Sequence, residues 1–206
     1  WMFETEKEAG LNGRALKYPR GKVIGGCSAI NGMISMRGQA ADYDHWRRLG
    51  LTGWGWDDVL PVFKQMEDHY AGASEHHGAG GEWRVERQRL SWQLLDAFRE
   101  AAAETGIPST PDFNRGDNEG CGFFEVNQRQ GVRWNTSKAF LRPAMRRPNL
   151  RVLTNAQVHR LMLDGKRVTG VEFYQGGEVV SAEAAVETVL AAGAIGSPQI
   201  LQVSGI

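Results

Sequence analysis

Two stretches of the chain place apolar residues at helical spacing. In residues 57–69, Leu60, Phe63 and Met66 fall on one side of a helix, and the acidic pair Asp57-Asp58 stands where a cap is expected. The second predicted helix begins at the cap Ser91 and ends before Gly106. One of its faces carries four apolar side chains: Leu94, Leu95, Phe98 and Ala102.

The pattern changes to alternation after Pro148-Asn149. Alternating apolar residues predict strands, and short Gly-containing pairs between them predict tight hairpin turns. The predicted strands are Leu150 to Leu153, Val158 to Leu163, Val168 to Tyr174 and Val179 to Ala182, with turns at Asp164-Gly165 and Gly176-Gly177.

The wholly apolar run Thr188 to Ala192 is typical of a strand buried on both faces of a parallel sheet. Gly193 to Gly196 would turn the chain, Ser197 would cap a helix, and Pro198 suits its first position. Ligands of open α/β sheets bind at such carboxyl ends of strands. The expected fold class is therefore a mixed α/β (α+β) arrangement.

Elsewhere the patterns are weaker. Residues 1–18 are predicted to be extended or loop, and Pro19 to Gly38 a turn that feeds a buried helical segment. Residues 112–132 have the polar and glycine-rich character of short strands with turns. Another helix is expected to start near Asn135 to Ser137.

Composition excludes several classes of function. Lys plus Arg number 24 and Asp plus Glu also number 24, so no net charge draws the chain to nucleic acid or an anionic membrane. No apolar run approaches the roughly 18 residues that span a bilayer, so no membrane span is expected. Cys27 and Cys121 suit a reduced, cytoplasmic compartment, with peripheral membrane association of the whole protein as an alternative.

Candidate chemistry centres on residues 19–33, around the pair Gly25-Gly26. Adjacent glycines let the main chain approach a planar ring or a pyrophosphate without interference from Cβ atoms. A tight structural turn explains the glycines equally well. The residues alone leave both interpretations open.

The whole string from Pro19 to Met33 resembles the first signature of the glucose-methanol-choline (GMC) oxidoreductase family. Gly53-Trp54-Gly55-Trp56 follows as in choline-dehydrogenase-like members, and Gly193 to Ile206 resembles the second signature. The resemblance implies an FAD/NAD(P)-binding-like fold. It assigns residues 1–80 and 133–206 to the FAD-binding domain and inserts 81–132 as a substrate-domain segment.

The same resemblance implies that FAD is the cofactor and which residues contact it. The implied contacts are Gly25, Gly26, Cys27, Asn31, Gly32, Met33, Ile34, Val158, Ala192 and Gly193. Some members bind FAD covalently through a His just before the signature Asn, where this chain has Ile30. Non-covalent FAD is therefore expected.

The resemblance places the catalytic His of the family after the second signature, so no catalytic residue is predicted here. The family's Gly-x-Gly-x-x-Gly turn has no counterpart either, and we expect an internal piece of a longer enzyme, inactive alone. The pair His76-His77 raises the idea of a metal, but without Cys or carboxylates at ligand spacing a solvated loop is expected and no metal is predicted. His45, His69 and His159 are expected to be surface or half-buried polar residues.

The implied activity is transfer of hydride from the CH–OH carbon of an alcohol, choline or another primary alcohol, to the flavin. The electron acceptor, whether oxygen, a quinone or another compound, is not specified by the sequence. A non-catalytic truncated paralogue that serves as a binding module is the alternative. A nicotinamide dehydrogenase is disfavoured because neither signature belongs to that class.

Overall fold

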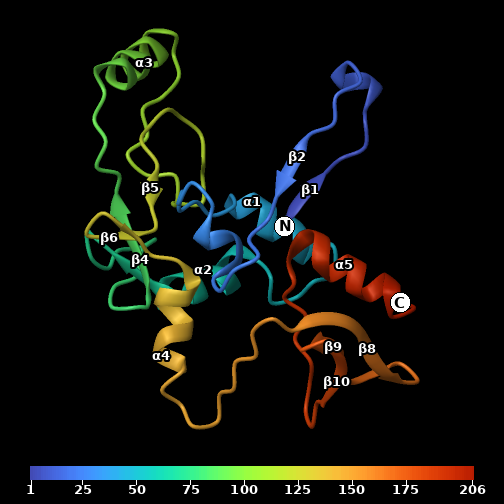
Figure 1. The fold of residues 1–206 in the computed structure, drawn as a ribbon. Coiled ribbons are helices and arrows are strands. Elements are labelled where there is room, and N and C mark those ends of the chain that lie inside the picture. Colours follow the sequence, from blue (N-terminus) through green and yellow to red (C-terminus); the bar gives the residue numbers. More distant parts are fainter. The chain divides into compact units, whose positions relative to one another are not determined.

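Both predicted amphipathic helices form in the computed structural model, which describes residues 1–206 (Figure 1). The first is α2 (Trp56–Met66), where the Asp58 carboxylate accepts a hydrogen bond from the Gly55 N–H group at 2.9 Å. Asp58 therefore supports the helix from its first turn, and Gly55 occupies the cap position. The second is α3 (Gln93–Glu104), and Gly106 follows it with a φ of 87°.

The helix α2 ends three residues earlier than predicted. Residues 67–69 form the strand β3 (Glu67–His69), which pairs in parallel with β4 (Trp83–Arg87). Pairing with β4 wins over continued helical periodicity because it satisfies main-chain groups at the helix end. The strand β5 (Glu125–Val126) completes this sheet and is antiparallel to β4.

A helix that the apolar pattern did not indicate, α1 (Ala40–Arg48), precedes α2. The Gln39 N–H group donates to Asp42 at 2.8 Å, which stabilises its start. The Tyr43 ring packs against Trp56 and Phe63 of α2 at centroid distances of 5.8 and 5.9 Å. Aromatic contacts therefore hold the two helices together.

Residues 1–18 are extended or loop, as predicted, whereas the segment from Pro19 to Gly38 differs from the prediction. The strands β1 (Met2–Glu4) and β2 (Lys17–Pro19) pair as an antiparallel ribbon, with a 3₁₀ turn at Ala9–Leu11. The predicted buried helical segment is wrong, because only a 3₁₀ turn at Gly26–Ala29 forms and both Ile30 and Ile34 are about half exposed.

The chain then continues through β6 (Gln128–Arg129) and β7 (Val132–Arg133), which form a hairpin. The predicted helix near residue 135 is confirmed as a π-helical turn at Ser137–Leu141 followed by α4 (Arg142–Ala144). The whole chain forms two compact units, Trp1–Arg147 and Pro148–Ile206, and the boundary between them lies shortly after α4. β4 and β5 lie within the predicted substrate-domain segment 81–132, whereas their partner β3 lies within the predicted FAD-binding portion 1–80. The assignment of these residues to two domains stays a prediction.

The second unit is a three-stranded antiparallel sheet with one helix. It consists of β8 (Gln157–Asp164), β9 (Arg167–Gln175), β10 (Glu178–Glu183) and α5 (Gly193–Val203). Leu161, Phe173 and Ile200 form its buried core. The first hairpin turn lies at Gly165-Lys166, one residue beyond the prediction, and the Gly176-Gly177 turn is confirmed.

Two strands predicted in this unit are absent. Residues 150–153 and 188–192 are irregular, and Val189 is 79% exposed. A strand exists only where a neighbour satisfies its main-chain groups, and neither stretch has such a neighbour here. The helix α5 also starts earlier than predicted, so Pro198 lies inside it and Ser197 accepts a hydrogen bond from the Ala192 N–H group at 3.0 Å.

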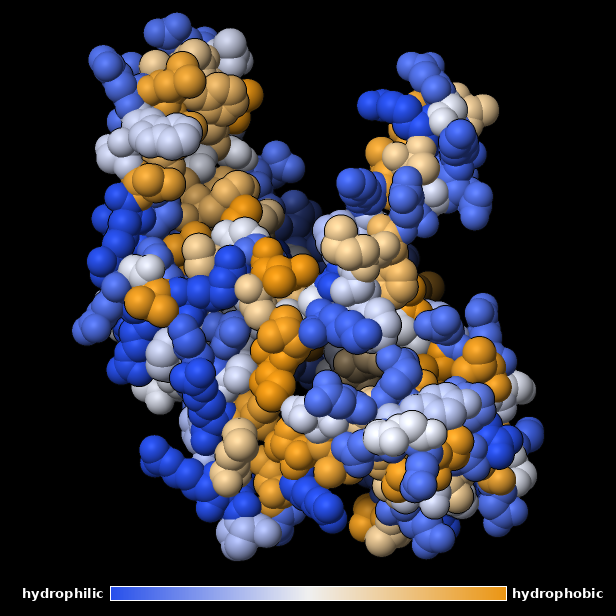
Figure 2. Space-filling view, viewed as in Figure 1, coloured by the Kyte–Doolittle hydropathy of each residue, from blue (hydrophilic) through white to orange (hydrophobic).

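The apolar face of α3 is buried only towards the C-terminal end of the helix. Ala102 is buried, whereas Leu94 and Phe98 are 76% and 66% exposed. Figure 2 shows apolar side chains gathered over this helix. The predicted apolar face therefore forms, but the rest of this chain leaves most of it uncovered.

Candidate functional site

The Gly25-Gly26 pair forms a turn that only glycine fits without strain. The φ angles are 96° at Gly25 and 52° at Gly26, and the Gly26 N–H group donates to the Val23 carbonyl at 2.8 Å. A Cβ atom on Gly21 would lie 2.2 Å from the Gly26 carbonyl oxygen. The turn therefore brings two stretches of main chain into direct contact, as expected of a ligand-binding loop and also of a tight structural turn.

The turn is anchored to the segment before the π-helical turn. The Thr136 N–H group donates to the Ser28 hydroxyl at 3.0 Å, and the Thr136 hydroxyl lies 3.3 Å from the Gly25 carbonyl oxygen. A Cβ atom on Gly25 would approach the Asn135 side chain to 3.2 Å. Residues 25–28 are thus held in place by a segment more than 100 positions away.

Asn31 is oriented on its oxygen side. Its Oδ1 atom accepts from the Met33 N–H group at 3.1 Å and from Arg133 Nη1 at 2.9 Å. Arg133 also donates to the Ser28 carbonyl at 3.2 Å. Asn31 is exposed, and both contacts within the chain go to its oxygen, so its amide nitrogen is left to donate to a ligand.

The segment after Asn31 lies against β5. The Ser35 N–H group donates to the Glu125 carbonyl at 2.8 Å, and the Asn127 N–H group donates to the Met33 carbonyl at 2.7 Å. Met33 has a left-handed φ of 65°, which is uncommon for a non-glycine residue and needs support from its surroundings. These two bonds supply that support.

The predicted contacts of the first signature are brought together in one exposed loop. Cys27, Asn31, Gly32 and Ile34 are exposed, and Gly25, Gly26 and Met33 are half-buried. The apolar side chains Val23, Ile24 and Ile30 are also about half exposed. A loop with small residues, an available amide donor and uncovered apolar side chains fits a large planar ligand with polar edges.

The other predicted contacts lie in the second unit. Val158 is half-buried on β8, where its Cα partner is Phe173 of β9. Ala192 and Gly193 are exposed at the start of α5. Gly193 has a φ of 86°, and a Cβ atom there would meet nothing within 4 Å. The roles of Val158, Ala192 and Gly193 as cofactor contacts stay predictions, as do those of the residues in the first unit.

A buried polar cluster in the first unit was missed by the sequence interpretation. His77 was expected in a solvated loop and His69 at the surface or half-buried, but they are only 5% and 6% exposed. His77 Nδ1 lies 2.9 Å from Glu67 Oε2, and His77 Nε2 lies 3.0 Å from Asp112 Oδ2. The carboxylates are supplied by residues 10 and 35 positions away, a separation that no spacing rule reveals.

The charge state of this cluster follows from its geometry. Burial alone would lower the pKa of His77, but hydrogen bonds to Asp112 and Glu67 outweigh it and raise the pKa to about 9. Burial would raise the carboxyl pKa of Glu67 and of Asp112, yet the hydrogen bond from His77 lowers both below their ordinary values. His77 is therefore an imidazolium between two carboxylates near neutral pH.

His69 stacks on His77 with ring centroids 3.8 Å apart and lies 3.0 Å from Glu125 Oε1 through its Nε2 atom. Donor atoms of His69, His77 and Glu125 all lie within 4.8 Å of one another, a spacing that suggests a metal. Both ring nitrogens of His77, however, face carboxylates and carry protons, so no lone pair remains for a metal. Hydrogen bonding explains the cluster better than metal ligation.

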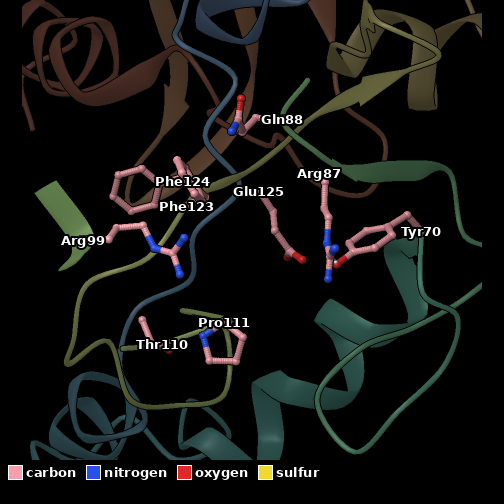
Figure 3. A pocket seen from close by; sticks show the side chains of 9 residues that line it. All are labelled: Tyr70, Arg87, Gln88, Arg99, Thr110, Pro111, Phe123, Phe124 and Glu125. Carbon is pink, nitrogen blue, oxygen red and sulfur yellow. Dashed lines mark hydrogen bonds between the residues drawn. The ribbon is translucent and has the colours of Figure 1, made fainter. Parts of the chain in front are cut away.

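A cavity of about 280 Å³ lies beside this cluster (Figure 3). It is lined by Tyr70, Arg87, Gln88, Arg99, Thr110, Pro111, Phe123, Phe124 and Glu125. Arg87 Nε donates to the Tyr70 hydroxyl at 2.6 Å across one side of it. Glu125 Oε2 is buried without a hydrogen-bond partner. The cavity contains no nucleophile and base in contact, so its lining does not form a catalytic centre.

Comparisons with known proteins identify relatives along the whole chain. The sequence profile of the GMC oxidoreductase family matches residues 5–206. Human mitochondrial choline dehydrogenase is 41% identical over 206 residues, which is all of this chain and 35% of that protein. An oxygen-dependent choline dehydrogenase of Brucella anthropi is 42% identical over the same length, 37% of that protein. The chain thus spans little more than a third of these relatives.

Solved structures give the same result. Pyridoxine 4-oxidase from Mesorbium loti superposes with a TM-score of 0.93 at 38% identity, over 100% of this chain and 41% of that one. An FAD-dependent oxidoreductase from Chaetomium thermophilum superposes with a TM-score of 0.91 at 29% identity, over 99% of this chain and 38% of that one.

No helix of the structure is long and apolar enough to cross a membrane.

Proposed function

Because this chain belongs to the GMC oxidoreductase family, we propose that it is the part of a flavin-dependent enzyme that holds FAD against an alcohol substrate. The enzyme would oxidise the CH–OH group of choline or another primary alcohol. The choline dehydrogenases among the relatives support this substrate class.

The exposed glycine loop is the observation that carries the proposal. The Gly25-Gly26 turn offers close main-chain approach, and Asn31 offers an amide donor whose oxygen is already fixed by Arg133. Val158, Ala192 and Gly193 are the proposed contacts from the second unit. FAD, when bound, supplies the hydride acceptor for alcohol oxidation. In this proposal the residues of this chain bind and orient the cofactor, and none of them is proposed as the base that accepts the proton.

The test is flavin content followed by reduction. Protein purified from its native source should carry flavin absorbance, and anaerobic choline or a primary alcohol should bleach it. A tertiary alcohol of similar size is the matched control, since it has no hydrogen on the carbinol carbon and should leave the flavin oxidised. Protein without flavin would contradict the proposal and favour the non-catalytic binding module.

We further propose a cytoplasmic location. Cys27 and Cys121 are both free thiols, and Cys27 is exposed, which suits a reducing compartment. Cell fractionation tests the cytoplasmic location. Recovery of the protein with the membranes, and its release from them by salt, would favour peripheral association instead.

The electron acceptor needs a separate test. Oxygen uptake measured beside reduction of a quinone analogue would identify it.

A further inference from the structure

The buried cluster around His77 closes into a ring of hydrogen bonds. Arg37 Nη2 lies 3.0 Å from Glu67 Oε1, and His77 bridges Glu67 to Asp112. Asp112 Oδ1 accepts from the Asn114 N–H group at 2.7 Å, and Asn114 Oδ1 accepts from the Arg37 N–H group at 2.8 Å. Each member therefore has a partner on both sides.

The ring is hydrogen-bonded to the segment that follows the glycine loop. Asn114 Nδ2 donates to the Ser35 carbonyl at 3.1 Å, and Arg37 Nη1 donates to the His76 carbonyl at 2.6 Å. Ser35 in turn pairs with Glu125 of β5. Met33, whose N–H group orients Asn31, pairs with Asn127, the residue after that strand. Contacts thus run without a gap from His77 to the loop proposed to face the flavin.

The charges explain why the ring needs His77. The side chains of Arg37, Glu67 and His77 are 5–8% exposed, so each charge has lost most of its hydration. The Glu67 carboxylate is buried and that of Asp112 is 17% exposed, and carboxylates with so little hydration remain favourable only while cations neutralise them. Removing the imidazolium leaves Glu67 with Arg37 and leaves Asp112 without a cationic partner in the ring.

We propose that His77 is a positioning residue for the flavin loop, acting through the ring of Arg37, Glu67, Asp112 and Asn114 to hold residues 31–37 in their binding conformation. This inference rests on the proposed function, because it concerns the same cofactor loop. His77 touches neither substrate nor cofactor in this role.

The pH dependence of the ring has a definite sign. The pKa of His77 is raised, so its contribution is fully present below about pH 6.5. The contribution is lost as pH rises towards about 9. The ionisable groups around His77 are Glu67 and His69 from β3, Asp112 from the loop after α3, Glu125 from β5, Arg37 through Glu67, and Arg115 through its charge on Asp112. Among these groups, only His77 lies between two carboxylates, so loss of its proton removes the positive charge that bridges Glu67 and Asp112.

The test compares His77→Gln with the neighbouring control His76→Gln in the flavin-loaded protein. The ring uses only the main-chain carbonyl of His76, which the control keeps. FAD dissociation constants and the visible circular dichroism of bound flavin are measured from pH 6 to pH 9, below the melting temperature of each variant. His77→Gln should weaken FAD by about tenfold at pH 6, the equivalent of about 1.4 kcal/mol, and flatten the pH profile.

A second variant tests the charge argument. Asp112→Asn in the His77→Gln background removes the unpaired carboxylate. The introduced glutamine amide can then donate both to Glu67 and to the neutral side chain at position 112, so the ring closes again without the imidazolium. FAD affinity should recover while the pH profile stays flat.

Two outcomes separate this inference from the proposed function. A His77→Gln protein with a lower melting temperature but unchanged FAD affinity, flavin spectrum and pH profile would overturn the inference. Wild-type protein that binds no flavin would instead overturn the proposed function.

Discussion

The glycine loop yields a prediction in which protein strain and cofactor contact are separable. Gly26 has a φ of 52°, and a Cβ atom there would meet nothing within 4 Å. Gly26→Ala therefore clashes with no other residue, and its cost to folding is the left-handed backbone of a non-glycine residue, about 1–2 kcal/mol. For a domain of this size each kcal/mol lowers the melting temperature by about 2–4 °C.

The chain provides a matched control in Gly165, at the turn between β8 and β9. Its φ is 56°, and a Cβ atom there also meets nothing within 4 Å. Gly165→Ala should lower the melting temperature of the protein by the same amount as Gly26→Ala. Only Gly26→Ala should weaken FAD, because only that methyl group would stand where the cofactor approaches.

The assay is thermal unfolding of the apoprotein together with titration of the apoprotein with FAD. We expect FAD affinity at least tenfold weaker for Gly26→Ala, which corresponds to about 1.4 kcal/mol, and unchanged for Gly165→Ala. If both variants lose stability equally and both bind FAD as the wild type does, the Gly25-Gly26 turn is structural and does not face the flavin.

Three further predictions concern other parts of the molecule. Gly21→Ala places a Cβ atom 2.2 Å from a main-chain oxygen and should destabilise the protein by about 1–3 kcal/mol, measured by urea unfolding; an unchanged midpoint would show that the turn shifts freely. Stability measured against pH should fall towards pH 9 as the raised pKa of His77 is passed, and should fall again in acid as its carboxylate partners are protonated; a flat curve in His77→Gln above about pH 6.5 is expected, and a flat curve in the wild type would refute the linkage. Because Ile30 stands where covalent members carry His, acid precipitation should release the flavin into the supernatant, and flavin in the pellet would contradict this.

Local patterns identified the helices α2 and α3 and the hairpins that join β8, β9 and β10. The apolar spacing of α2 and α3, and the alternation in β8 to β10, depend on residues a few positions apart, so they are visible in the sequence. The family signatures similarly pointed to Gly25, Gly26 and Asn31 as one loop. The structure confirms that these residues lie together and shows that Arg133 and Thr136 hold them.

The local patterns failed where the outcome depends on a distant partner. The apolar run 188–192 has the pattern of a strand, but a strand needs a neighbour and none is provided in this chain. Residues 67–69 continue a helical pattern, yet pairing with β4 turns them into β3. In both cases the missing information is which main-chain groups will be satisfied, and by what.

The sequence by itself determined the family and the regular elements of local period, and it predicted the loop that is proposed to contact the cofactor. Only the tertiary structure decided that His77, Glu67 and Asp112 form one buried charged cluster. The physical reason is that periodicity is set by the geometry of neighbouring residues, whereas burial and charge pairing depend on which distant segments the fold brings to within about 3 Å.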